Sequence, residues 1–165
     1  QVGAVLRHAM LLAGECRELE TLGLGQNRLG AKGLERLEEG LKGCQALTHL
    51  DLRANGLGDA GAVRLASVLA GGGCARLRRL DLRRNSIANE GARALAEAMG
   101  QCRALGVLDL SANGIAAEGA ERLVARLGNC KALQRLDVRG NWLGEAEVGR
   151  VAKSLSPADA RIMLL

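Results

Sequence analysis

Leucine and other apolar residues recur along the chain at two alternating spacings. One half of each unit reads LxxLxLxxNxL; in one copy these positions are Leu77, Leu80, Leu82, Asn85 and Ile87. The central x-L-x-L-x alternation is the period of a strand with one buried face. The other half carries small or apolar residues at helical spacing, such as Gly91, Leu95 and Met99. Each unit is therefore predicted to contain a strand followed by a helix.

Five such units follow one another, beginning at Leu19, Leu47, Leu77, Leu105 and Leu133. Successive starts are 28 residues apart, except for 30 in the second unit, where Gly71-Gly72-Gly73 absorbs the extra length. A single strand and helix cannot bury both of their apolar faces, but stacked copies can. The repeat predicts strands near 50–52, 80–82, 108–110 and 136–138, and helices near 60–70, 90–99, 118–127 and 145–155.

The two ends of the chain depart from the repeat. Residues 1–18 are expected to form a partial preceding repeat or a cap helix, and residues 19–155 the five repeats. Residues 156–165 allow two structures. Leu164 stands 28 residues after Leu136, which predicts a strand at Ile162 to Leu165. Ser156-Pro157-Ala158-Asp159 instead has the composition of a helix start, as in a short capping helix. The chain is expected to be a fragment of a longer one.

The repeat resembles the ribonuclease-inhibitor type of leucine-rich repeat, which also occurs in NOD-like receptors and Ran GTPase-activating proteins. The resemblance covers residues 19–155 and rests on five copies of LxxLxLxxN and a GAxxL-like helix start. It implies an α/β leucine-rich repeat solenoid, a horseshoe segment with a parallel concave sheet and convex helices. Repeat one departs with Gly23 and Gly25. Repeat five departs with Trp142 and lacks the helix glycine found at 33, 61, 91 and 119.

Composition and charge narrow the class of protein. Phe and Tyr are absent and Trp142 is the one aromatic residue, so the core must consist of Leu, Ile, Val and Ala. The net charge is +5 and the pI is about 9.3, which permits an acidic partner without requiring one. Stretches without a charge are short and interrupted by glycine, so no membrane span is expected.

Two polar columns recur once in every repeat. The amides just after the strands are expected to satisfy backbone groups where the chain turns, as a structural ladder; they are Asn27, Asn55, Asn85, Asn113 and Asn141. The thiols before each first leucine are expected to be small buried core residues rather than disulfides or metal ligands; they are Cys16, Cys44, Cys74, Cys102 and Cys130. Reduced thiols favour a cytoplasmic, intracellular protein.

No constellation of catalytic residues is apparent. The two histidines, His8 and His49, lie in different elements, and no HExxH motif or paired nucleophile occurs. Gly71-Gly72-Gly73 lacks the Lys-Ser/Thr that a phosphate-binding loop needs. The sequence therefore predicts a protein that is not an enzyme and has no catalytic residue, cofactor or metal site.

The outward strand positions provide the candidate binding surface. Asp51, Asp81, Asp109 and Asp137 form one row, flanked by rows rich in Arg. Part of this pattern is expected to be a self-neutralising surface, in which the Arg side chains offset the charge of the Asp row. The remainder predicts a concave binding face made of His49, Arg53, Arg79, Arg83, Arg84, Arg135, Arg139 and Trp142. Trp142 either shields the last repeats or anchors a partner, and the convex face stays open as an alternative binding surface.

The leading functional hypothesis is a protein–protein interaction module in a regulatory or sensing protein. Its partner would be another protein or another domain of the same chain, and the Arg bias favours an acidic one. One alternative is part of a GTPase-activating protein, although no functional residue of the Ran GTPase-activating family can be placed on this sequence. The other is a nucleic-acid-binding surface, which the pI fits. The strands, however, carry no aromatic residue on which bases could stack.

Overall fold

The chain folds as a row of strand–helix units stacked side by side. The computed structural model describes residues 16–126, 129–153 and 162–163. The strands are β1 (Thr21–Gly23), β2 (His49–Asp51), β3 (Arg79–Asp81), β4 (Val107–Asp109), β5 (Arg135–Asp137) and β6 (Ile162–Met163). The helices are α2 (Gly30–Gly43), α3 (Gly58–Ala70), α4 (Asn89–Ala98), α5 (Ala117–Ala125) and α6 (Glu145–Lys153). Short 3-10 turns, η2 (Cys16–Glu18) and η3 (Met99–Gln101), precede β1 and follow α4.

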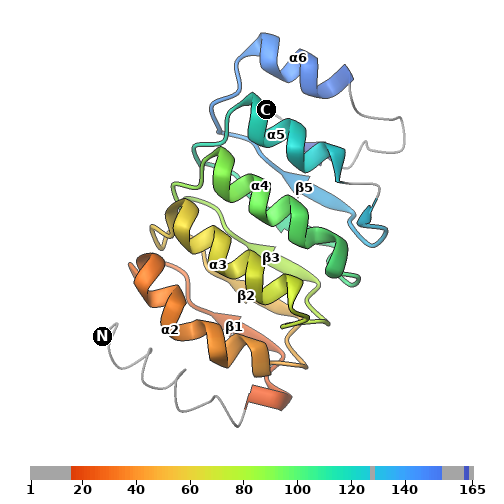
Figure 1. The fold of residues 1–165 in the computed structure, drawn as a ribbon. Coiled ribbons are helices and arrows are strands. Elements are labelled where there is room, and N and C mark those ends of the chain that lie inside the picture. Colours follow the sequence, from red (N-terminus) through yellow and green to blue (C-terminus); the bar gives the residue numbers. More distant parts are fainter. Residues whose placement is uncertain (1–15, 127–128, 154–161, 164–165) are drawn as a thin grey trace.

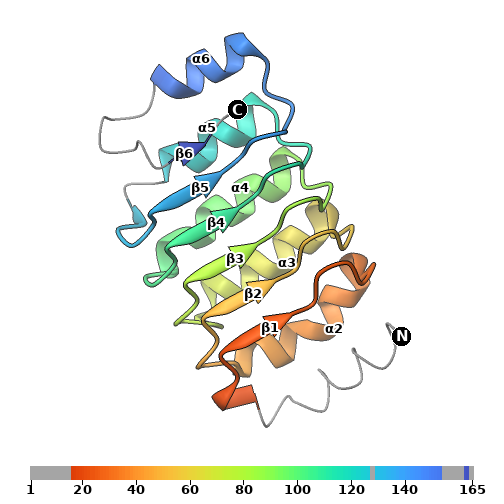
Figure 2. The same cartoon turned by 180° about the vertical axis from the view of Figure 1, so that it is seen from behind.

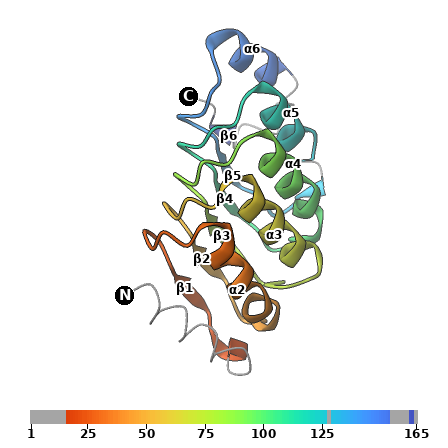
Figure 3. The ribbon, with the colours of Figure 1, turned by 60° about the vertical axis from the view of Figure 1, so that its left-hand side comes forward.

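All six strands form one parallel sheet in sequence order (Figure 2). The register places one apolar column along the middle of the strands: Leu22, Leu50, Leu80, Leu108, Leu136 and Ile162. Helices α2 to α6 cover one face of this sheet, and no described helix lies on the other face (Figures 1 and 3). The predicted α/β leucine-rich repeat solenoid with a parallel sheet is therefore confirmed.

The strands begin one residue earlier than the sequence pattern predicts. β2 spans residues 49–51, whereas the repeat predicts 50–52. The third leucine of the motif still takes part in the ladder, because the Leu52 N–H donates to the Asp81 carbonyl at 2.9 Å. The chain then turns away toward its helix, so the difference concerns only where the strand ends.

The core is one continuous layer between the sheet and the helices. Strand leucines such as Leu80 and helix leucines such as Leu95 belong to the same buried cluster. All five cysteines are also buried in this layer. The prediction that the thiols are core residues is confirmed. Burial raises the pKa of the Cys74 thiol to about 12 and that of Cys102 to about 11.

Glycine stands in the first turn of the central helices because a side chain would not fit there. A Cβ atom added at Gly91 would lie 2.7 Å from Asp59 Oδ1 and 2.8 Å from Ile87 Cγ2. At Gly119 it would lie 2.7 Å from Asn89 Oδ1. Each of these helices therefore approaches the preceding repeat at its start more closely than any L side chain would allow.

The ends are described in part. At the C-terminal end, Ile162 and Met163 pair with Leu136 and Asp137, so a strand occupies the position of a sixth repeat. The alternative helix start at residues 156–159 lies outside the described residues, as do residues 1–15. Among the residues that are described, no helix is long and apolar enough to cross a membrane.

Candidate interaction surface

The side-chain amide of Asn85 joins its own repeat to the preceding one. This side chain is fully buried. Its Oδ1 accepts hydrogen bonds from the backbone N–H groups of Asn55 (3.0 Å) and Leu57 (3.4 Å) in the preceding repeat. Its Nδ2 donates to the carbonyls of Leu52 (3.0 Å) and Leu82 (2.9 Å). One side chain thus satisfies several backbone groups that would otherwise be buried without partners.

The same arrangement recurs at Asn55 and Asn113, and the terminal amides of Asn27 and Asn141 make fewer of these hydrogen bonds. Asn141 Oδ1 accepts from the Ile115 N–H at 3.0 Å. The Asn27 amide donates to two carbonyls of its own repeat, those of Leu24 and Gly25. The ladder fixes the turns that follow the strands, so the side chains displayed on the sheet are held in a rigid register.

The aspartate row lies beneath the arginines rather than beside them. Asp81 and Asp137 are 5% and 1% exposed. These carboxylates occupy outward strand positions but are not exposed, and Asp109 is buried as well. The physical reason is that the neighbouring side chains fold over the carboxylates. Arg83 contacts Asp81 through Nε–Oδ1 (3.1 Å) and Nη2–Oδ2 (2.8 Å).

Asp137 shows the electrostatic consequence of this arrangement. Burial opposes its ionisation, but hydrogen bonds from the side chain and backbone of Arg139 hold its pKa below the ordinary value. Arg139 Nη2 lies 2.6 Å from Asp137 Oδ2, and Arg135 Nη2 lies 3.2 Å from the same oxygen. The carboxylate therefore stays charged and fixes two guanidinium groups in place.

The predicted binding residues are divided between two environments. On the sheet, Arg53, Arg83, Arg135 and Arg139 each pair with an aspartate. Arg79 forms no ion pair with any described residue. His49 Nδ1 lies 2.9 Å from the hydroxyl of Thr48.

Arg84 and Trp142 lie beyond the sheet, in the loops that follow the strands. They border a depression of about 370 Å³ together with Ser86, Ala112 and Gly114. Trp142 is 74% exposed, so it covers little of the last repeats. Its ring edge lies over Gly114, with Cζ2 3.9 Å from where a Cβ would stand. These two residues form a loop-rim patch, and Arg84 connects it to the arginines of the sheet, because Arg84 also lines a depression of about 480 Å³ with Arg53 and Arg83.

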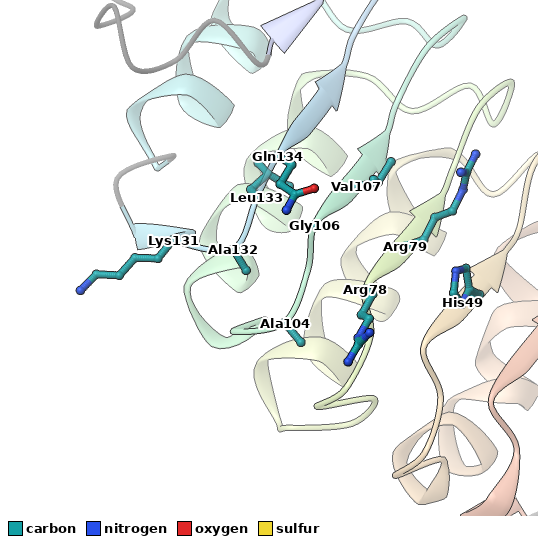
Figure 4. Close-up of a pocket in the computed structure, with 10 residues that line it drawn as sticks. All are labelled: His49, Arg78, Arg79, Ala104, Gly106, Val107, Lys131, Ala132, Leu133 and Gln134. Atoms are coloured by element: carbon teal, nitrogen blue, oxygen red, sulfur yellow. The ribbon is translucent and has the colours of Figure 1, made fainter.

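A second depression, which sequence reasoning missed, lies where strands β2 to β5 begin (Figure 4). Its volume is about 900 Å³, and Arg78 and Lys131 line it together with His49 and Arg79. The signal is present in the position directly after the first leucine of each repeat, which reads Glu20, Thr48, Arg78, Gly106 and Gln134. The strand alternation used to predict the binding surface begins one residue later, at positions such as Arg79. It therefore includes neither Arg78 nor Gly106, which has no side chain.

Within the described ranges, no three His, Cys, Asp or Glu residues gather in a way that could hold a metal ion. The features that stand out are instead charged side chains on a rigid sheet and several shallow depressions between them. Such surfaces can bind a partner by hydrogen bonds and ion pairs.

Comparisons with known proteins agree with this architecture. The family model described as Leucine Rich repeat matches residues 43–66, 73–96 and 101–124. Among solved structures, the fold is similar to "Leiomodin-1 Actin-Binding Site 2 (ABS2)", with a TM-score of 0.68 over 91% of this chain and 88% of that chain. The two sequences are 15% identical, so this likeness shows the fold alone. No curated protein matches the sequence. The chain thus contains leucine-rich repeats.

Proposed function

We propose that this array of leucine-rich repeats is a non-catalytic module that binds another protein, or another domain of the same chain, on its concave sheet. One observation carries the proposal. The sheet face opposite the helices is not covered by any described helix or strand (Figure 2). The side chains of Arg79, Arg135 and Arg139, which lie on this sheet, are exposed. Exposed arginines on a rigid surface are typical of binding interfaces.

The paired arginines support this function through their fixed geometry. Asp81 and Asp137 hold the guanidinium groups of Arg83 and Arg139, and both arginine side chains remain more than a third exposed. A guanidinium carries five N–H donors, so those not used by the aspartate can bind a partner. Little side-chain entropy would be lost on binding, because the arginines are already ordered.

The similarity to known folds supports the same general role. The leiomodin structure is that of an actin-binding site, and this chain shares its fold. A 28-residue unit with a full helix supports the ribonuclease-inhibitor type of repeat. We infer an intracellular regulatory or sensing protein from the buried thiols and this repeat type, with the partner's identity set by the displayed side chains.

Site-specific photo-crosslinking in cells tests which face binds. A photoreactive residue would replace Gly23 or Arg135 on the concave sheet. No atom lies within 4 Å of a Cβ at Gly23, and Asp137 keeps Arg139 when Arg135 is removed. The matched convex positions are Lys32 and Glu121, which are exposed on helices α2 and α5.

The expected result is crosslinked protein from the two concave positions and little from the two convex ones. Crosslinks from the convex positions alone would show that the helices are the binding face. Crosslinks to RNA in place of protein would favour the nucleic-acid alternative.

A further inference from the structure

The depression at the start of the strands gathers basic side chains from separate repeats. Arg78 and Arg79 come from the β3 strand and the residue before it, His49 from β2, and Lys131 from the loop before β5. Figure 4 shows His49, Arg78 and Arg79 along one side and Lys131 extending outward at the opposite border. None of the residues that line the depression is acidic.

These cations differ from the arginines in the middle of the sheet. Arg83 and Arg139 are held by Asp81 and Asp137 at 2.8 and 2.6 Å. Within the described part of the chain, Arg78, Arg79 and Lys131 form no ion pair with any carboxylate. An anion arriving here would not have to displace an internal partner, whereas on the aspartate row it would. The positive charge available to a ligand is therefore concentrated at this edge.

Gly106 creates the space. In the column that it shares with Thr48, Arg78 and Gln134, it is the one position in the four central and C-terminal repeats without a side chain. A Cβ added there would lie 3.6 Å from the Arg78 carbonyl oxygen and 3.7 Å from that of Ala132, which is ordinary contact. The backbone therefore does not require glycine, and its effect is to open the floor of the depression.

From this geometry we infer that the depression binds an acidic peptide segment of the partner, an inference that rests on the proposed protein-binding function. Glutamate and aspartate carboxylates match the forked donors of Arg78 and Arg79. Ala104, Val107 and Ala132 line the space between the cations and can contact the methylene groups of such side chains. Neither Phe, Tyr nor Trp lines the depression, and the His49 imidazole is the one ring among its lining residues, so it offers a nucleic acid little surface for base stacking.

The test uses a fluorescently labelled oligoglutamate peptide and measures its binding to the full chain by fluorescence anisotropy. The variant carries Arg78→Gln, Arg79→Gln and Lys131→Gln. The control carries Lys32→Gln, Arg36→Gln and Arg122→Gln, which remove the same charge from exposed positions on α2 and α5 that form no ion pair with described residues. The affinity should fall by about tenfold or more in the first triple variant and about twofold or less in the control.

A second pair of variants tests shape without changing charge. Gly106→Leu should fill the floor of the depression and weaken peptide binding by about tenfold, as expected when a bound group is sterically excluded. Gly106→Ala should bind nearly as well as the unchanged protein, because the added methyl group makes only ordinary contacts. Circular dichroism of both variants shows whether the fold is retained.

Several results would overturn the inference. Equal losses in the two triple variants would mean that net charge alone attracts the peptide. Absence of oligoglutamate binding to the unchanged protein, or stronger binding of an oligothymidine strand or of inorganic phosphate at the same residues, would do so too. If the concave crosslinks form in cells while the Arg78, Arg79 and Lys131 changes have no effect, the proposed function stands and this site fails.

Discussion

The third and fourth repeats and the fifth repeat share one strand motif but hold their helices in different ways. Asp59 Oδ1, at the start of α3, accepts hydrogen bonds from the Ala88 N–H (2.7 Å) and the Gly91 N–H (3.0 Å) at the start of α4. Asn89, at the start of α4, does the same for Ala116 (2.9 Å) and Gly119 (3.2 Å) at the start of α5. A side chain of one repeat therefore caps the helix of the next.

This capping of one helix by a side chain of the preceding repeat is missing for the helix of the fifth repeat. The residue equivalent to Asn89 is Ala117, which has no acceptor to offer to α6. The helix glycine is replaced by Glu147, whose Oε2 would lie 2.6 Å from a Cβ at Gly144. This carboxylate has turned back toward the start of its own helix. The interior helices are thus fixed by their neighbours, whereas α6 depends on its own side chains, and the stability of each repeat reflects what the preceding repeat supplies.

The largest expected difference between interior and end lies in the asparagine ladder. Asn85→Ala removes a fully buried amide that serves backbone groups of two repeats, and should lower the free energy of unfolding by about 3 kcal/mol. Asn27→Ala removes two hydrogen bonds within one repeat and should cost about 1 kcal/mol. Urea denaturation followed by circular dichroism measures both. Equal midpoints would show that the ladder is not cooperative.

Glycine-to-alanine substitutions should change the free energy of unfolding in opposite directions in an interior helix and in α6. Gly91→Ala would force a methyl group to within 2.7 Å of Asp59 Oδ1, and should destabilise by about 1–3 kcal/mol. Gly149→Ala, in α6, meets no atom within 4 Å and should stabilise by about 0.5–1 kcal/mol, because alanine is the better helix former. Thermal denaturation of the two variants would contradict the comparison if both moved the midpoint in one direction.

Thiol labelling compares the two regions in the unchanged protein. Cys102 and Cys130 are 7% and 4% exposed, so the static structure predicts no faster reaction for Cys130. Opening of the fifth repeat should nevertheless cost less than opening of an interior one, and Cys130 should react about tenfold faster, a difference of roughly 1.4 kcal/mol in opening. Mass spectrometry after timed alkylation measures each site. Similar rates in the native protein, as expected in denaturant, would mean that the array opens as one unit.

The fold could be predicted from the sequence because five copies of the same motif indicate the same strand and helix. The rows of Leu22, Leu50, Leu80, Leu108 and Leu136 give the strand register directly, and the period places the helices within a few residues of their observed bounds. The strands were displaced by one residue, because the motif marks buried leucines rather than hydrogen-bonded boundaries.

The surface was predicted less well because it depends on which neighbouring side chains pair with one another. Alternation shows that Asp81 and Arg83 share a face, but not that the arginine folds over the carboxylate and buries it. Likewise, Asp59 reads as an ordinary acid in the first turn of its own helix, while its acceptor serves the next repeat. Whether a cation is available to a partner follows from these pairings, which sequence spacing does not determine.

The substitution with the smallest expected effect would give the helix of the fifth repeat the cap that it lacks. Ala117→Asn places at the start of α5 the amide that Asn89 provides at the start of α4, and it should cap the N–H groups of Gly144 and Glu147. A gain of about 0.5–1 kcal/mol is expected from such a cap. Slower hydrogen exchange at these two amides measures it locally.

Ala31→Asn is the matched control for this gain, because it sits at the same position of the first repeat. The two N–H groups that it would cap already have acceptors. The Gly58 N–H donates to the Asn85 carbonyl at 2.8 Å, and the Gly61 N–H donates to the Leu57 carbonyl at 3.0 Å. An added acceptor there has no donor to satisfy, so the exchange of Gly58 and Gly61 should not change. If Ala117→Asn and Ala31→Asn protect their targets equally, the missing cap is not what distinguishes the fifth repeat. If neither protects, Glu147 already satisfies the start of α6, and the difference between interior and end rests on packing alone.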